Sequence, residues 1–192
     1  MRVLRNLFAM IGVIAVAGAL WAGWRVTNAF GSFDPQAPQV YWSMAKRLAE
    51  TGNAAEATVW KRKVADGLTF EEVDQSIQSV AAAMNIKDVG ALPLGDQVAA
   101  MKGAPWRKLK IYLYCNPLTA AAMIDYSDAY SAYLPCRVSL LEDKTGALWL
   151  YSLDMDMMIH GGLPLPDDLR AEAEKVKEII LAVLDGGASG EL

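Results

Sequence analysis

Cysteine and histidine are scarce in this sequence, and the scarcity excludes several classes of protein. There are two cysteines, one histidine and no Cys-x-x-Cys pair, so neither a thioredoxin-type redox motif nor covalent haem attachment is indicated. The chain also lacks the Gly-x-Gly-x-x-Gly fingerprint of dinucleotide binding and the Gly-x-Ser-x-Gly of serine hydrolases. A single histidine leaves no spare general base. A non-catalytic protein is therefore the first hypothesis.

Positive charge is scarce once the N-terminal segment is set aside. Residues 1–30 hold three arginines and no acidic residue, so the remaining chain has 15 Lys and Arg against 22 Asp and Glu, a net charge of -7. Binding to nucleic acid needs clustered cations that neutralise phosphates. Anionic lipid headgroups also repel an acidic domain. We therefore expect no nucleic-acid partner, and we expect the domain not to lie flat on the lipid surface.

One segment has no charged residue at all. The run from Asn6 to Trp24 is almost entirely apolar, and as a helix it would be roughly 28 Å long, close to the thickness of a bilayer's hydrocarbon core. It is apolar on every side rather than along one stripe, which disfavours a helix on the surface of a soluble domain. We predict one N-terminal transmembrane helix within residues 1–30, with the lipid bilayer as its partner.

The charges around this run predict its orientation. Arg2 and Arg5 precede it, only Arg25 follows it closely, and the first acidic residue is Asp34. Positive charge tends to stay on the cytoplasmic side, so the rest of the chain is expected outside. In a bacterium this means a single-pass protein of the inner membrane with its C-terminal domain in the periplasm.

A cleaved signal peptide is the alternative to a retained anchor. The small residues around 15–17 resemble a peptidase site. The apolar run is longer than a usual signal core, however, and Trp21 and Trp24 extend it beyond that point. Tryptophans at this position also suit the interfacial belt where a helix leaves the membrane. We favour the retained anchor.

After the anchor we expect a linker and juxtamembrane helix over 31–57, a globular domain over 58–185 and a flexible tail over 186–192. Prolines and a glycine end the membrane helix within 31–38. A short helix over 39–50 places Tyr41, Trp42 and Met44 near the membrane. Aromatic and methionine clusters suit both cores and interfaces, so these residues either pack on the domain or bind a partner. With Trp21 and Trp24 they are the candidate partner-binding residues.

The domain reads as α+β. Strands are expected at 58–65, 85–93 and 109–115, with a hairpin of 135–143 and 147–153. A helix follows Thr69, which forms a capping box with Glu72. Further helices are expected after Asn116 and over 167–184, and the segment 154–160 is expected to be extended. Hairpins and flanking helices without strict strand–helix alternation favour α+β over α/β.

Several of these segments carry a family resemblance. Residues 64–70, 114–117, 133–137, 142–149 and 154–162 are similar to the bacterial and archaeal family called domain of unknown function 302. The chain looks like the membrane-anchored or exported subset. The resemblance implies a mostly antiparallel sheet with helices on one face, a TATA-binding-protein-like architecture. It implies neither DNA binding nor any particular activity.

The cysteines and one methionine-rich segment are the candidate metal ligands. Thiolate, thioether and imidazole together suit Cu(I), so Cys115, Cys136, Met158 and His160 form a possible copper site. An extended segment would place Met155 and Met157 on one face and Met158 and His160 on the other. Core filling is the alternative role for the methionines. The cysteines alternatively form a disulfide, if their strands run antiparallel, or remain buried thiols.

Two other groups of polar residues have a structural and a functional interpretation. Asp154 and Asp156 would face the same side of a strand, as a cation-binding or acid–base pair or as solvated carboxylates. Five tyrosines near the third strand and the next helix either line an apolar pocket or partner surface or pack in the core. These are Tyr112, Tyr114, Tyr126, Tyr130 and Tyr133.

The leading hypothesis is a membrane-anchored periplasmic accessory protein that binds an integral membrane protein without catalysing a reaction. A free-standing anchored domain without a partner is the simplest alternative. A second is a small-ligand or copper-binding protein in periplasmic redox or sulfur metabolism. A third is an enzyme with a cysteine nucleophile, which requires a cysteine within hydrogen-bond reach of His160. No cofactor other than copper is indicated.

Overall fold

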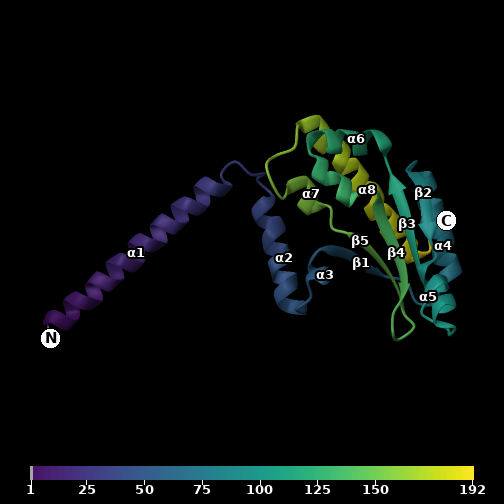
Figure 1. The fold of residues 1–192 in the computed structure, drawn as a ribbon, viewed down its shortest axis with the longest axis horizontal. Helices are drawn as coiled ribbons and strands as arrows, with labels where there is room; N and C mark the ends of the chain where they lie inside the picture. The colour runs from purple at the N-terminus through teal and green to yellow at the C-terminus, as the bar shows by residue number, and fades with distance from the viewer. Residues whose placement is uncertain (1) are drawn as a thin grey trace.

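The computed structural model describes residues 2–192, apart from the side chains of residues 2–5, 7 and 29. A long helix, α1 (Arg2–Phe30), extends away from an α+β domain (Figure 1). Within α1, residues Phe8–Asn28 have the length and composition of a membrane span or of a signal sequence, and none of this stretch is buried. The membrane orientation predicted for this helix rests on Arg2 and Arg5, whose side chains lie outside the part that the structure describes.

The domain is built on one five-stranded sheet in the order β1-β5-β4-β3-β2, with every neighbouring pair antiparallel. The prediction of an α+β fold with a mostly antiparallel sheet is thereby confirmed. The strands are β1 (Val59–Lys63), β2 (Lys87–Leu92), β3 (Leu109–Cys115), β4 (Cys136–Glu142) and β5 (Leu148–Leu153).

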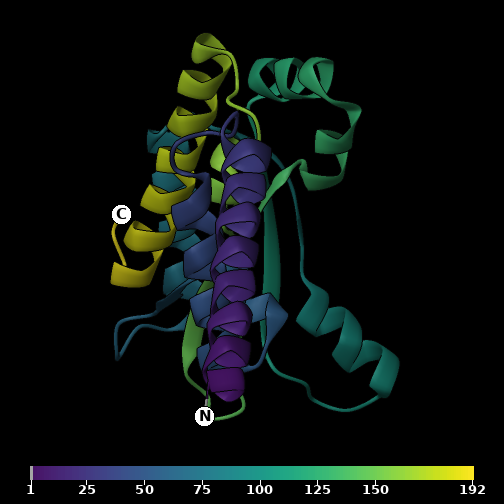
Figure 2. The same ribbon diagram turned by 90° about the vertical axis from the view of Figure 1, so that its left-hand side faces the viewer.

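Two helices cover one face of the sheet and enclose the core. They are α4 (Phe70–Ala83), which begins with the predicted capping box of Thr69 and Glu72, and α8 (Asp167–Ser189). Buried side chains from alternate strand positions, such as Val138, Leu140 and Leu150, point towards these helices. In Figure 2, α8 (yellow) lies on one side of the strands and α5 (teal) lies on the other, whereas α6, which follows the end of β3, packs against α8.

The flexible tail predicted over 186–192 is wrong for its first residues, because α8 continues to Ser189. Gly186 and Gly187 are buried where α8 passes closest to α4 and the sheet. A Cβ atom on Gly187 would lie 2.8 Å from Ile77 Cγ1 and 3.0 Å from Leu150 Cδ1. The glycines therefore allow close packing, which stabilises a helix end that their own propensity would weaken.

The remaining helices of the domain have four to fifteen residues each. They are α2 (Ala37–Thr51), α3 (Ala54–Ala57), α5 (Leu94–Lys102), α6 (Pro117–Tyr126), the 3-10 helix η1 (Asp128–Tyr133) and α7 (Asp156–His160). The helix expected after Asn116 is α6, and the extended backbone of Ser127 separates it from η1. The extended conformation expected for 154–160 is wrong, because most of this segment forms α7.

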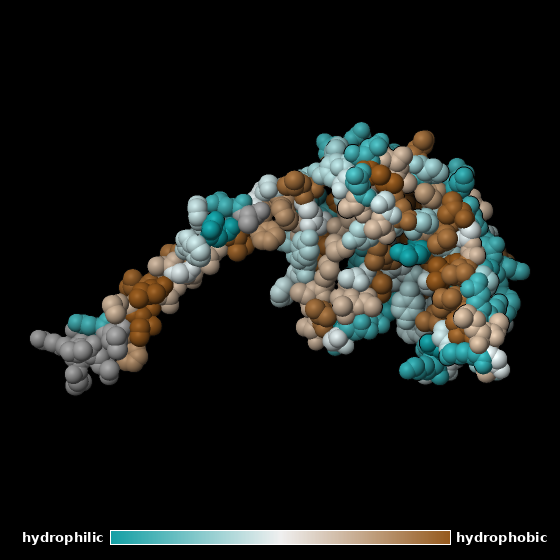
Figure 3. Space-filling model, viewed as in Figure 1, coloured by the Kyte–Doolittle hydropathy of each residue, from teal (hydrophilic) through white to brown (hydrophobic). Residues whose placement is uncertain are grey.

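The opposite face of the sheet, here called the outer face, is apolar and partly exposed. It carries Ile111, Leu113, Leu141, Trp149 and Tyr151, which alternate with the buried positions of β3, β4 and β5. Hydrophobic residues gather over β3 in the space-filling view (Figure 3). The two large helices α4 and α8 leave this face free, so the sheet has one covered and one solvent-facing side.

Candidate functional site

Five sulfur-containing side chains line one small cavity of about 30 Å³ at an end of the sheet. Because β3 and β4 are antiparallel, the end of one meets the start of the other, and Tyr114 pairs with Cys136. Both cysteines therefore lie at the same end of the sheet, and both are free thiols. We call this the sulfur cavity, and its sulfur donors are Cys115, Cys136, Met123, Met155 and Met158.

The surroundings of the sulfur cavity favour the neutral thiol of Cys136 over its thiolate when no metal ion is bound. Burial, with a smaller contribution from the neighbouring Cys115, raises the pKa of the Cys136 thiol to about 11. A neutral thiol is a poor nucleophile, so the environment of Cys136 opposes the cysteine-enzyme hypothesis. A bound metal ion would supply the positive charge that the thiolate lacks here.

His160 does not take part in the sulfur cavity. Its Nδ1 lies 3.2 Å from Asp34 Oδ2, its Nε2 lies 2.6 Å from Glu174 Oε1, and the residue is 2 % exposed. The predicted four-residue copper site is thus divided, with three members together and His160 elsewhere. The reason is that α7 is helical rather than extended. In a helix, residues two apart, such as Met158 and His160, point to different sides, whereas residues three apart, such as Met155 and Met158, share one side.

No alternative metal site replaces it among the carboxylates and nitrogen donors. Across the described residues, no three His, Cys, Asp or Glu side chains gather closely enough to hold a metal ion. Asp154 and Asp156 were also expected to face the same side of a strand. This is wrong, because each carboxylate pairs with a different basic side chain. Asp154 accepts a hydrogen bond from Arg47 at 3.1 Å, and Asp156 accepts one from Lys177 at 2.9 Å.

The buried His160 connects the segment after α1 to the domain. Asp34, which is 3 % exposed, contacts the imidazole, and its backbone N–H donates to the Gly162 carbonyl at 2.8 Å. Tyr41 donates from its hydroxyl to the Gly161 carbonyl at 2.6 Å. The segment 33–47 is therefore docked on the domain, and the prediction of a plain linker over 31–38 is wrong from Asp34 onward.

The two acids around His160 are held in their charged forms. Burial acts to raise the pKa of Asp34, but a hydrogen bond from the Gln36 N–H and the contact with His160 outweigh it, so the pKa is lowered. Burial likewise opposes the charge of Glu174, and hydrogen bonds from Lys177 and His160 lower its pKa. Both nitrogens of the ring can donate to these acids only if the imidazole is doubly protonated.

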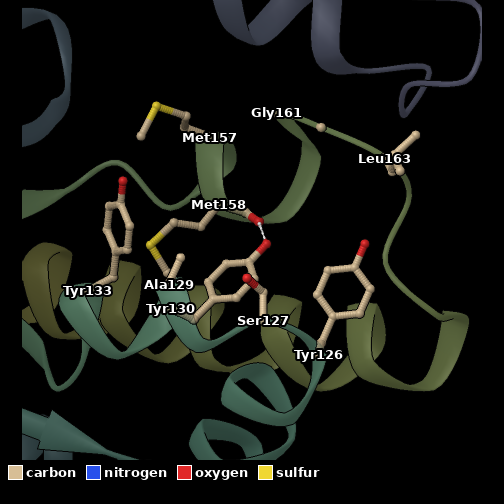
Figure 4. A pocket seen from close by; sticks show the side chains of 10 residues that line it. Tyr126, Ser127, Ala129, Tyr130, Tyr133, Met157, Met158, Gly161 and Leu163 are labelled. Atoms are coloured by element: carbon tan, nitrogen blue, oxygen red, sulfur yellow. Dashed lines mark hydrogen bonds between the residues drawn. The ribbon is translucent and has the colours of Figure 1, made fainter.

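A second, larger hollow lies beside α7 and opens to solvent. This tyrosine pocket has a volume of about 450 Å³ and is formed by η1, α7 and the loop that follows α7 (Figure 4). Tyr130 donates from its hydroxyl to the Met158 carbonyl at 2.9 Å, which fixes one wall. Its lining residues include Tyr126, Ser127, Ala129, Tyr130, Tyr133, Met157, Met158, Gly161, Gly162 and Leu163.

The five predicted tyrosines thus divide into two groups. Tyr126, Tyr130 and Tyr133 line the pocket, as one interpretation of the sequence expected. Tyr112 and Tyr114 are core residues, and Tyr112 donates to Asp74 at 2.6 Å. The Tyr114 hydroxyl has no hydrogen-bond partner among the described residues. No local pattern in the sequence separates the two groups, because the division depends on which elements pack over each ring.

Most of the candidate partner-binding residues are exposed. Trp21 and Trp24 lie open on α1, and Trp42 on α2 is 72 % exposed. Tyr41 is partly engaged by its hydrogen bond to Gly161, and Met44 is partly buried. The sequence did not identify the full apolar stripe of α2, whose exposed members are Tyr41, Trp42, Ala45, Leu48 and Ala49.

Comparison with known proteins places the domain but assigns no activity. No curated protein matches the chain. A crystal structure of an uncharacterized conserved protein, DUF302, from Bacillus stearothermophilus is 16% identical, with a TM-score of 0.52 over 67% of this chain and 96% of that chain. That likeness is one of fold. A family model described as "Domain of unknown function DUF302" matches residues 60–186, from β1 into the last turn of α8. By this match the chain belongs to the DUF302 family.

Proposed function

We propose that the protein is a single-pass, membrane-anchored accessory subunit that binds an integral membrane protein in the bacterial inner membrane, with its domain in the periplasm. The observation that carries the proposal is the apolar stripe of α2. A helix on the surface of a domain normally buries its apolar side. In α2 the inner side buries Ala37 and Val40, and an additional apolar stripe around Trp42 and Leu48 faces solvent.

The position of this stripe favours a partner within the membrane. Six residues separate Phe30, the end of α1, from Ala37, the start of α2, so these two residues lie at most about 25 Å apart. The segment is also fixed to the domain through Asp34, Tyr41 and Arg47. The stripe is therefore held close to the point where α1 would leave a bilayer. Exposed apolar stripes of this kind are typical of protein interfaces.

Co-purification of the full-length tagged chain from native membranes in mild detergent tests this proposal. We expect an integral membrane protein in a fixed ratio to the chain. The double substitution Trp42→Ser and Leu48→Ser should reduce its recovery at least tenfold, because two apolar anchors at an interface are worth more than about 1.4 kcal/mol together. Thermal unfolding of the domain should be unchanged, because neither residue is buried.

The matched control replaces two apolar residues elsewhere that are even more exposed than Trp42 and Leu48. Met101 and Leu118 lie on α5 and α6, away from α2. The double substitution Met101→Ser and Leu118→Ser should leave the recovered partner at the wild-type ratio. Recovery of the chain alone, or an equal loss in both double variants, would contradict a partner bound through α2.

A second candidate function is Cu(I) binding in the sulfur cavity. Its support is the convergence of two thiols and three thioethers on a space large enough for one ion and little more. Soft sulfur ligands select Cu(I) over harder cations. Binding through both cysteines would release their two protons to solvent, so the affinity should rise with pH. His160 is not a ligand in this arrangement, since Asp34 and Glu174 occupy its ring nitrogens.

Anaerobic titration with Cu(I) in competition with a chromogenic chelator tests the second candidate. We expect one Cu(I) per chain, loss of at least a hundredfold in affinity for Cys115→Ser with Cys136→Ser, and a smaller loss for Met158→Leu. The control is Met101→Leu, because Met101 is exposed and far from the cavity. Equal competition by the wild type and the double cysteine variant would exclude the site.

A further inference from the structure

We infer that the tyrosine pocket binds an uncharged, planar ligand from the lipid phase, of the quinone class, whose ring carries hydrogen-bond-accepting oxygens. This inference is independent of the partner and of copper. It rests on the proposed function in one respect only, which is that α1 spans a bilayer.

The size and lining of the pocket determine the charge and character of the ligand. Its volume of about 450 Å³ lies within the range of small-molecule sites. Tyrosine rings, two methionine thioethers and Leu163 make up its walls, and no lysine, arginine, aspartate or glutamate lines it. A charged ligand would find no opposite charge among these residues and would lie against mostly apolar walls. Aromatic faces and methionine sulfur pack favourably on flat rings.

The free hydroxyls determine which polar atoms the ligand should carry. The Tyr130 hydroxyl is occupied by the Met158 carbonyl. The Tyr126 and Tyr133 hydroxyls stand on either side of it, and neither is drawn with a hydrogen bond in the pocket (Figure 4). A phenol hydroxyl donates readily to a carbonyl oxygen, so a ring with carbonyl or alkoxy oxygens would satisfy either tyrosine. Quinones combine a flat, uncharged ring with such acceptors.

The position of the pocket favours a ligand from the membrane over one from water. The Gly161 and Gly162 carbonyls at its rim accept hydrogen bonds from Tyr41 and from the backbone of Asp34. Asp34 lies four residues after the end of α1, so the rim is within about 14 Å of that end. With α1 in a bilayer, the pocket opens near the lipid headgroups, where quinone rings and other uncharged amphipaths are concentrated.

Photolabelling of the full chain in phospholipid nanodiscs tests the inference. The probe is a short-tailed azido-ubiquinone, and the competitor is ubiquinone-1. We expect labelled peptides from residues 126–133 and 155–163 and protection by excess ubiquinone-1. Tyr126→Phe with Tyr133→Phe should weaken the competitor's apparent affinity about tenfold, because two hydrogen-bond donors are removed while the rings remain.

Two further variants separate a filled pocket from a general loss of structure. Gly162→Leu should abolish protected labelling, because a Cβ there meets no atom within 4 Å and the side chain enters open space. Tyr151→Phe on the outer face should have no effect. Labelling confined to α1, equal loss in Tyr151→Phe, or equal protection by oleate would overturn the inference.

Failure of the membrane anchor remains distinguishable from failure of the pocket. If α1 does not insert, the chain will not co-elute with the nanodiscs, whatever the labelling of the pocket in detergent. If the chain co-elutes and the tyrosine pocket is unlabelled, the anchor stands and the quinone site is rejected.

Discussion

The substitution His160→Ala is expected to lower the free energy of unfolding of the domain by about 3 kcal/mol. The imidazole lies between Asp34 and Glu174, and its removal leaves the Asp34 carboxylate buried with one fewer hydrogen bond. Removing a hydrogen-bond partner from a buried carboxylate is among the costliest single changes, because the remaining charge is not solvated. Urea denaturation of the full chain in detergent, followed by circular dichroism, measures the loss.

The control for this prediction is Glu172→Ala on the same helix. Glu172 pairs with Lys175 on the exposed side of α8, and such surface pairs contribute about 0–1 kcal/mol. His160→Ala should also expose the backbone of residues 34–47 to hydrogen exchange, since Asp34 loses its contact with the domain. A loss of less than about 1 kcal/mol with unchanged exchange would mean that other contacts dock this segment.

The same cluster predicts an acid limit of stability. The pKa of Asp34 is lowered from its usual 3.8, and that of Glu174 is lowered from 4.5. An acid whose pKa is lower in the folded state stabilises the fold fully above its unfolded pKa. That contribution disappears as the pH falls through the folded value. Below about pH 4 the wild type should therefore lose stability more steeply than Asp34→Asn, in urea titrations at each pH.

The elements that the sequence predicted well are those with local patterns. The capping box at Thr69, the strand Leu109–Cys115 and the turn between β4 and β5 depend on residues close together in the chain. The antiparallel sheet with helices on one face came from the family resemblance, and the structure agrees. Local patterning and family membership therefore suffice for the architecture of the domain.

The parts that the sequence did not predict depend on distant contacts. Asp34 and His160 lie 126 residues apart, and no periodicity links them. The helix α7 is too short for a helical repeat to distinguish it from a strand. The buried end of α8 required knowledge that Ile77 and Leu150 would pack against its glycines. These misses fall at the candidate sites, where tertiary packing overrides local preference.

The short helix α7 connects all three candidate sites. Met155, just before it, and Met158 face the sulfur cavity, while Met157 and Gly161 line the tyrosine pocket. His160 faces the docked segment that follows α1. A ligand in either hollow would therefore contact the same element that holds this segment. The conformation of α7 therefore determines the shape of both hollows and the position of the docked segment.

Gly161→Ala is accordingly expected to destabilise the domain by about 2–3 kcal/mol, whereas Gly162→Ala should change its stability by less than about 0.5 kcal/mol. A Cβ on Gly161 would collide with the Met157 backbone, including its carbonyl oxygen, and it would disturb the carbonyl that accepts the Tyr41 hydroxyl. A Cβ on Gly162 meets no atom within 4 Å.

Urea denaturation of the two variants side by side provides the comparison, because each adds a single methyl group to adjacent residues. In Gly161→Ala the end of α7 must shift, so the docked segment should also become sensitive to limited proteolysis between residues 34 and 47. Gly162→Ala should remain as resistant as the wild type. Equal stability of the two variants would show that α7 can adjust at no cost, and the close packing at Gly161 would then not be what fixes the segment 34–47.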